Sequence, residues 1–280
     1  MQGFGDKNQS KKKNFRIKNK KFYNDQLVQK AFQFQAQGKK LEAAKYYSYL
    51  IKNGLEDYRV FSNYGAFLRE IGKYQEAELI LNKAIKLNPR CANSLYNLAG
   101  LFIIKGDLLK GEIYLRKAID FKSDFASAHY NLGFILKNLG KLQESKLYFQ
   151  RAIEIDPNLT EAYLSLSTIK DIEKDSNWEN QLFSEGFLNN KNDREIVNIL
   201  FARSNILHKK RKFRENAEYL IKANNLKLNM YKSTAKLLIK KTNKLKISLD
   251  NFQRNFKEYP DYPLSIFIVG LPRCGSTLVE

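Results

Sequence analysis

Cysteines and long apolar runs are both scarce in this sequence of 280 residues. Its two cysteines, Cys91 and Cys274, lie far apart and lack the spacing of a CxxC motif, so the sequence predicts neither a disulfide framework nor a metal site. No stretch approaches the roughly 18 apolar residues of a membrane span, and the amino-terminal residues lack the apolar segment of a secretory signal. We therefore expect a cytoplasmic protein with reduced thiols and no membrane span.

Acidic residues are too few to balance the basic ones, and the net charge is +20. Most of the excess lies in residues 1–21, with a net charge of +7, and in residues 208–257, with +12. Lys and Arg can bind a nucleic-acid backbone, but a solvated tail and helical lysines explain both blocks, and no RNA- or DNA-binding motif accompanies them. We therefore do not expect a nucleic-acid partner, and residues 1–21 are predicted to form a basic, disordered tail.

A period of 34 residues runs through the first half of the chain. It links four glycines: Gly38, Gly72, Gly106 and Gly140. The same step links several other sets: Asn63, Asn97 and Asn131; Gly65, Ala99 and Gly133; and Ala84, Ala118 and Ala152. A fixed period of this length indicates stacked units that share one supersecondary structure.

The repeated residues suit a pair of antiparallel helices. The four periodic glycines can turn the chain between two helices at positive φ, and the small residues allow the helices to approach closely. Pro89 and Pro157 then end the second helix of their units. This pattern resembles the tetratricopeptide repeat (TPR), with units at 24–57, 58–91, 92–125 and 126–159. The predicted fold class of residues 22–159 is therefore all-α, a TPR-type helical solenoid.

The resemblance also implies a binding groove on the first helices of the units. In the TPR family, the asparagine at the positions of Asn63, Asn97 and Asn131 faces the groove and can hold a peptide backbone. Tyr96, Tyr130 and Phe134 would share this face, although aromatic residues in helix pairs serve more often as packing groups. The implied partner is a protein or peptide bound in the TPR groove.

The period weakens after Pro157. Residues 160–229 are predicted to form degenerate TPR-like helices, with Arg211 in the usual glycine position and Asn216 in a usual alanine position. Residues 230–260 then predict one Lys-rich helix with a buried stripe of Leu and Phe. His129 and His208 have no partners at metal-binding spacing and are interpreted as surface or packing residues.

The carboxyl-terminal residues indicate a different kind of structure. An apolar, β-branched run at 266–269 leads into a turn at 270–275 and then into residues that can open a helix. The turn has the glycine spacing of a phosphate loop, but Ser276 stands where a nucleotide triphosphatase has its lysine, so ATP or GTP hydrolysis is not expected. Backbone amides at Gly275, Ser276 and Thr277 can still bind an anion, for which Arg273 supplies the positive charge.

This run, IVGLPRCGSTLVE, resembles the 5′-phosphosulfate loop of sulfotransferases, including bacterial members fused to TPR units. By that resemblance Arg273, Gly275, Ser276 and Thr277 would bind PAPS, the sulfuryl donor, as a co-substrate and without a metal. Cys274 stands at a position usually held by serine. Residues 261–280 would then be the truncated strand–loop start of an α/β, P-loop-like sulfotransferase domain.

The expected function is the amino-terminal part of a TPR-containing, PAPS-dependent sulfotransferase, whose repeats recruit a protein or peptide partner or acceptor. In that family the 3′-phosphate ligands and the general base lie beyond the loop, so the catalytic residues are unknown here. Because sulfuryl transfer needs those groups, we expect the chain by itself to be inactive. The alternative is a non-enzymatic TPR scaffold for protein interaction, in which the terminal strand and loop are a vestige.

Overall fold

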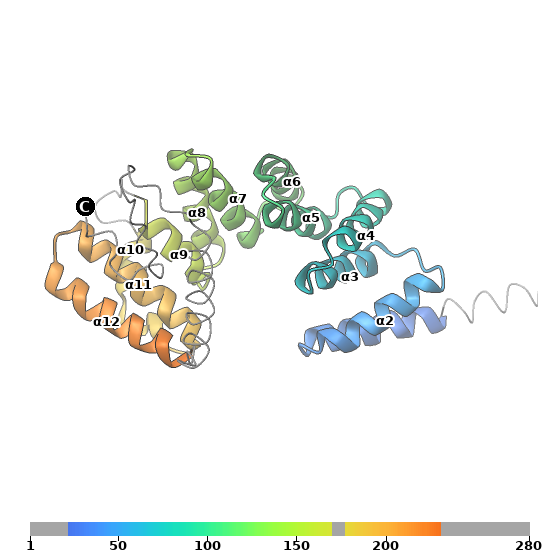
Figure 1. Cartoon of the computed structure of the whole chain (residues 1–280), viewed down its shortest axis with the longest axis horizontal. Helices are drawn as coiled ribbons and strands as arrows, with labels where there is room; N and C mark the ends of the chain where they lie inside the picture. The colour runs from blue at the N-terminus through green and yellow to red at the C-terminus, as the bar shows by residue number, and fades with distance from the viewer. Residues whose placement is uncertain (1–21, 170–176, 231–280) are drawn as a thin grey trace, which may run out of the picture. The chain divides into compact units, whose positions relative to one another are not determined.

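The computed structural model describes residues 22–169 and 177–230 (Figure 1). The chain divides into two units, residues 1–227 and 228–280, and only residues 228–230 of the second unit are described. The predicted tail at 1–21, the Lys-rich helix at 230–260 beyond Met230, and the strand and phosphate loop at 261–280 lie outside the described residues. Within the described ranges the regular structure is helical throughout, without a strand.

Residues 22–155 form four helix pairs. The first pair consists of the helical residues 22–36 and α2 (Lys40–Lys52). The other three pairs are α3 (Tyr58–Glu70) with α4 (Tyr74–Leu87), α5 (Ala92–Ile104) with α6 (Leu108–Phe121), and α7 (Ala126–Asn138) with α8 (Leu142–Ile155). The second helix of each pair also contacts the first helix of the next pair, and α8 contacts α9. The pairs therefore stack in chain order as a helical solenoid (Figure 1).

The turn inside each pair confirms the predicted use of glycine. Gly38, Gly72, Gly106 and Gly140 all have positive φ, between +73° and +80°. At Gly72 the glycine N–H donates to the carbonyl oxygen of Arg69, and the next N–H, that of Lys73, donates to that of Leu68. This pair of bonds satisfies carbonyls that a helix end would otherwise leave free. The same two bonds recur at the other three glycines, which gives every pair the same turn.

Small residues allow the two helices of a pair to approach closely. A Cβ atom at Gly65 would lie 2.6 Å from Leu81 Cγ, and one at Gly133 would lie 2.8 Å from two ring carbons of Phe149. Leu81 and Phe149 are fully buried and belong to the apolar clusters between the helices. The prediction that these slots need small residues is therefore confirmed at Gly65 and Gly133.

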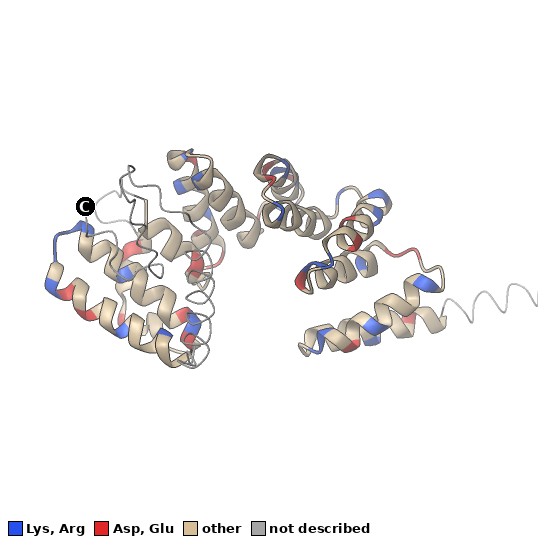
Figure 2. Cartoon of the chain, viewed as in Figure 1, with Lys and Arg blue, Asp and Glu red and all other residues tan. Residues whose placement is uncertain are grey.

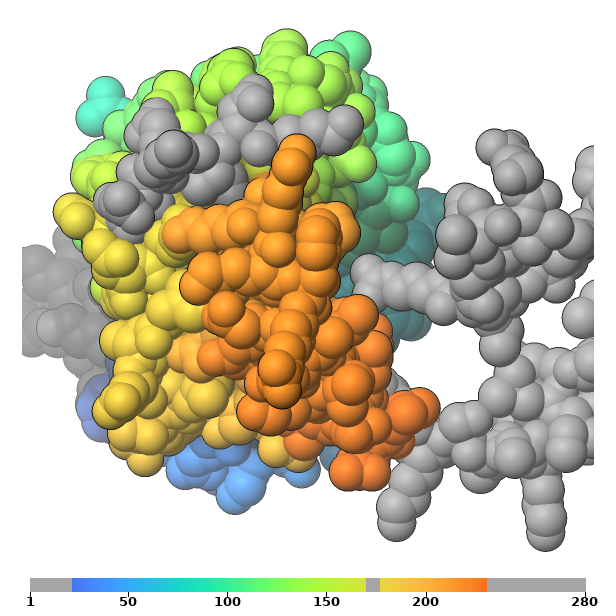
Figure 3. Space-filling view, turned by 90° about the vertical axis from the view of Figure 1, so that its left-hand side faces the viewer, coloured from blue at the N-terminus to red at the C-terminus, as the bar shows by residue number. Residues whose placement is uncertain are grey.

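The described part of 160–230 departs from this regular pattern. It contains α9 (Thr160–Ser167), α10 (Asn177–Phe183), a 3-10 helix η1 (Glu185–Leu188), α11 (Asp193–Lys209) and α12 (Phe213–Met230). Here α9 packs directly against α11, while α10 and η1 contribute aromatic side chains to the core around α9. Helix α12 lies at the surface in Figure 3, and Ala223 is its buried residue.

Charged residues of both signs lie along the helices (Figure 2). Many form ion pairs, such as Lys40 with Glu70 at 2.8 Å between α2 and α3. None of the described helices combines the length and the apolar composition of a membrane span.

Candidate functional site

A groove crosses the first helices of three successive units. Its volume is about 540 Å³, within the range of about 300–1,000 Å³ that is typical of ligand sites. It is lined by residues of α3, α5 and α7 and by the start of α4: Arg69, Glu70, Tyr74, Tyr96, Gly100, Ile103, Ile104, Tyr130, Asn131 and Phe134. The stacking of the first helices side by side therefore produces one continuous surface from three parts of the sequence.

Three of the aromatic residues that line the groove lie on α5 and α7: Tyr96, Tyr130 and Phe134. The ring of Tyr96 packs against Phe125 at 4.8 Å between ring centroids, and the ring of Tyr130 packs against Phe149 at 5.8 Å. Burial raises the pKa of Tyr130, and a hydrogen bond with Ser165 opposes that rise. The two tyrosines thus combine the packing role with a place in the groove wall. Phe134, in contrast, is 40% exposed, so part of its side chain is open to solvent in the groove.

Arg69 places a positive charge across the groove. Its Nη1 donates to the backbone carbonyl oxygen of Asn97 at 3.3 Å, so the side chain reaches from α3 onto α5. It lies directly over Gly100, where a Cβ atom would be 2.1 Å from Nη1. No acidic residue in the described part of the chain forms an ion pair with Arg69, whereas the adjacent Glu70 is paired with Lys40. The Arg69 guanidinium can therefore attract a carboxylate of a ligand.

The three repeated asparagines have different surroundings. Asn131 lines the groove, and its side chain forms no hydrogen bond with the described residues. Asn63 Nδ2 instead donates to the Tyr47 hydroxyl at 3.3 Å, and Asn97 Nδ2 to Ser62 Oγ at 3.5 Å. The structure therefore brings Asn131 together with Tyr96, Tyr130 and Phe134, while the Asn63 and Asn97 amides link neighbouring helices away from that lining.

The sequence did not point to Arg69 or Gly100. The next unit has Ile103 at the repeat position of Arg69. The neighbouring units have Ala66 and Phe134 at the repeat position of Gly100. A glycine inside a helix, in a position that holds a larger residue in other units, was the available signal. The glycine leaves room for the Arg69 side chain above it, and the spacing of residues in the sequence does not reveal this contact.

The predicted donor-binding residues Arg273, Gly275, Ser276 and Thr277 lie outside the described residues. Among the residues that are described, no group of three or more His, Cys, Asp or Glu side chains is placed to hold a metal ion. The thiol of Cys91 is free.

The tetratricopeptide repeat family matches the sequence at residues 33–87, 68–124 and 126–159. Among solved structures, pilF of Pseudomonas aeruginosa is 13% identical, with a TM-score of 0.56 over 79% of this chain and 97% of that chain. MamA from Desulfovibrio magneticus RS-1 is 16% identical, with a TM-score of 0.45 over 74% of this chain and 96% of that chain.

The first TPR of Spaghetti (RPAP3), solved with the HSP90 peptide SRMEEVD, is 25% identical, with a TM-score of 0.39 over 40% of this chain and 89% of that chain. A search of curated proteins gives no match. The family matches and the likeness of fold to pilF agree with the repeated helix pairs, and the chain therefore contains tetratricopeptide repeats in a helical solenoid.

Proposed function

We propose that this chain is a protein-interaction scaffold whose groove across α3, α5 and α7 binds an extended peptide segment of a partner protein. The observation that supports this most is the convergence of three groups on one groove: the amide of Asn131, the exposed ring of Phe134 and the guanidinium of Arg69. Within residues 22–169 and 177–230 the amide has no hydrogen-bond partner and the guanidinium no ion-pair partner. Asn131 and Phe134 lie on α7, and Arg69 lies on α3.

The three groups would recognise different parts of a peptide. The amide of Asn131 has both a donor and an acceptor, so it can pair with the N–H and C=O of an extended backbone. Phe134, with Tyr96 and Tyr130 beside it, offers apolar area for a side chain of the peptide. Arg69 favours a carboxylate over a basic group at its end of the groove. An extended peptide with an apolar residue near an acidic one fits this arrangement.

Peptides selected from a random library on the wild-type protein would test the proposal. Their affinities are then measured by fluorescence anisotropy for Asn131→Ala and Phe134→Ala. Truncation of an exposed interface aromatic or of a hydrogen-bonding side chain removes about 1–2 kcal/mol, so each variant should bind about tenfold more weakly. Leu142→Ala is the matched control, because Leu142 is 43% exposed, similar to Phe134, but lies outside the groove lining.

Equal losses in Leu142→Ala and Phe134→Ala would contradict the groove as the binding surface. Failure to select any peptide that competes for the groove would contradict a peptide-binding function. All of these variants lie in the first unit, residues 1–227.

Residues 263–280 support a second proposal, the donor loop of a PAPS-dependent sulfotransferase with a TPR array. It rests on the loop sequence alone, in particular on Arg273 before Gly275, Ser276 and Thr277 and on the absence of the triphosphatase lysine. The donor's bisphosphate product should raise the melting temperature of the chain, because a ligand that binds the native state stabilises it. Arg273→Ala should abolish this shift, while Arg254→Ala, outside the loop, should retain it. An absent shift in the wild-type chain would remove the support for a donor site.

A further inference from the structure

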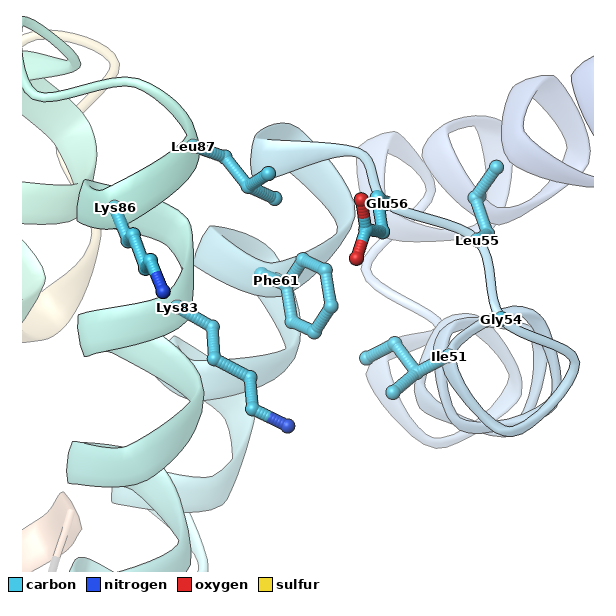
Figure 4. Close-up of a pocket in the computed structure, with 8 residues that line it drawn as sticks. All are labelled: Ile51, Gly54, Leu55, Glu56, Phe61, Lys83, Lys86 and Leu87. Atoms are coloured by element: carbon cyan, nitrogen blue, oxygen red, sulfur yellow. The ribbon is translucent and has the colours of Figure 1, made fainter.

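A second hollow lies at the boundary between the first two helix pairs, at the opposite end of α3 from the groove. Figure 4 shows side chains from α2, the connector after it, α3 and α4 around this space, which has a volume of about 570 Å³. It is lined by Ile51, Gly54, Leu55, Glu56, Phe61, Lys83, Lys86 and Leu87. Phe61 and Arg69 are eight residues apart on α3, so at 1.5 Å per residue the two sites are separated by roughly 12 Å along the helix.

The hollow exists because this boundary is built differently from the later ones. Helix α2 ends at Lys52 and is followed by Gly54, which has a φ of +80°. The N–H groups of Gly54 and Leu55 bond back to the carbonyl oxygens of Ile51 and Leu50. The helices α4, α6 and α8 instead end in cap residues with φ between −131° and −144° and ψ between 88° and 94°. The later boundaries have Pro89, Ser123 and Pro157 where this one has Leu55. The glycine turn carries the chain away from α4 and leaves a space between the connector and that helix.

The walls of the hollow have two chemical characters. Phe61, 6% exposed, and Leu87, 42% exposed, supply apolar surface. Lys83 and Lys86 lie one helical turn apart on α4 and form no ion pair with the described residues. In Figure 4 the Lys83 side chain extends from α4 to a point below Phe61, and the Lys86 side chain runs along α4 toward Lys83. Glu56, on the connector side, also has no ion-pair partner in the part of the chain that the structure describes.

We infer that this hollow binds a short acidic segment of a partner protein, with an apolar side chain against Phe61 and Leu87 and carboxylates beside Lys83 and Lys86. Charge complementarity selects this occupant, because two exposed ammonium groups on one wall attract a carboxylate-rich segment. It also disfavours the chain's own residues 1–21 and 231–257, which are basic, and a second copy of a chain with a net charge of +20.

A peptide segment also suits Glu56 better than a simple anionic amphiphile does. The hydrocarbon tail of such an amphiphile would place apolar groups against the Glu56 carboxylate and offer it no hydrogen-bond donor. A peptide backbone supplies N–H donors for Glu56 as well as side-chain carboxylates for the lysines. The hollow is therefore a second interaction surface, separate from the groove.

An array of short synthetic peptides would test this surface directly. Each peptide contains one residue chosen from Leu, Ile, Phe and Trp, flanked by Asp and Glu, and each has a counterpart with Lys in place of the acidic residues. The acidic peptides should bind the full chain and their Lys counterparts should not. Binding should weaken with added salt, because exposed charges are screened.

Matched variants distinguish the hollow from the rest of the surface. Lys83→Glu and Leu87→Ser should each weaken binding of the acidic peptides by about fivefold to tenfold. Their controls lie 34 residues later, in the corresponding positions of the next pair: Lys117→Glu and Phe121→Ser, with Phe121 at 48% exposure against 42% for Leu87. Neither control residue lines the hollow, and both controls should bind as the wild type does.

Three outcomes would overturn the inference. The acidic peptides could bind no better than their Lys counterparts, or the control variants could lose as much affinity as the hollow variants. Alternatively, Arg69→Ala, which alters the groove, could abolish binding while Lys83→Glu leaves it unchanged. Because the groove and the hollow share no lining residue, this last comparison separates failure of this inference from failure of the groove proposal.

Discussion

The regular helix pairs between Tyr58 and Ile155 and the last pair, α11 with α12, form a similar hydrogen-bonded contact between their helices with different residues. In the regular pair α7–α8, Gly133 faces Ser145, whose hydroxyl donates to the Gly133 carbonyl oxygen at 2.7 Å. In the last pair, Ser204 and Asn216 occupy the corresponding positions, seven residues before and five after the turn residue, and they hydrogen-bond to each other at 2.5 Å. The position where the two helices cross thus requires a short side chain. Two small polar residues meet this requirement when they hydrogen-bond to each other.

The turn between α11 and α12 has the same backbone hydrogen bonds as the glycine turns of the regular pairs. Arg211 has a φ of +60°, and the N–H groups of Arg211 and Lys212 bond to the carbonyl oxygens of His208 and Leu207. This is the bonding pattern of the glycine turns, here formed by a residue with a side chain. The same turn geometry therefore forms at a residue whose side chain disfavours positive φ.

The helix α9 differs from both regions because aromatic side chains from α10 and η1 pack around its core residue Tyr163. Tyr163 is fully buried and packs against Phe187 at 5.0 Å and Trp178 at 6.4 Å between ring centroids. Phe61, Leu95 and His129 occupy the corresponding position in the preceding units. His129 accommodates the position with a contact of 2.9 Å between Nε2 and the Ser123 carbonyl oxygen, and burial lowers its pKa. One position of the repeat thus tolerates four side chains, each with its own neighbours.

The largest expected effect is at Tyr163, where aromatic packing replaces the regular helix pair. Tyr163→Ala should lower the free energy of unfolding by about 3–5 kcal/mol, the usual cost of deleting a buried aromatic side chain. Urea denaturation followed by circular dichroism measures this. A loss below about 1 kcal/mol would mean that α10 and η1 are held by other contacts.

Tyr163→Phe is the control for this change. Among the described residues the Tyr163 hydroxyl has no hydrogen-bond partner, and burial raises its pKa. Removing an unsatisfied buried hydroxyl should leave the stability unchanged or raise it by up to about 1 kcal/mol. A strong loss in this variant would show that the hydroxyl, and not the ring, stabilises the region.

The next effect concerns the close approach in the regular pairs. Gly133→Ala should cost about 1–3 kcal/mol, because the new Cβ atom would overlap the buried Phe149 ring and a packed core resists the shift. Gly186→Ala makes the same change where the nearest atom would be 3.8 Å away, so it should be nearly neutral. Equal changes in the free energy of unfolding would show that the helices of a regular pair can move apart without loss of stability. A short side chain at the positions of Gly133 and Ser204 would then not be a requirement of the packing.

The sequence predicted the regular pairs well because their requirements recur at a fixed spacing. The turns at Gly72, Gly106 and Gly140 and the small residue at Gly65 follow directly from the period. The groove was predicted only in part, because the surroundings of Asn131 depend on which neighbours stand beside it in the stack. The links between α9 and α11 could not be predicted either, since they join residues that are 38 apart, Asn198 with Thr160 and Asn205 with Ser167, and so depart from the period.

The smallest effect is a gain of stability at Arg211, where the last pair lacks the glycine of the regular pairs. A residue with a Cβ atom in the left-handed region costs about 1–2 kcal/mol. Arg211→Gly removes that cost, but the added freedom of the unfolded chain offsets about 0.4–1 kcal/mol of it. We expect a net gain of about 0.5–1 kcal/mol, measured as a rise in the urea midpoint at constant slope.

The reciprocal change tests whether the two turns are equivalent. Gly140→Arg places a side chain at a φ of +77°, where open space surrounds the position, so its cost should come from the backbone alone, at about 1–2 kcal/mol. Asn190→Gly is the control, because Asn190 also has positive φ, at +58°, but asparagine tolerates this region and should gain less than Arg211 does. If Arg211→Gly destabilises the chain, the arginine side chain must make stabilising contacts there, and the last turn would then differ from the regular ones in its energetics as well as in its sequence.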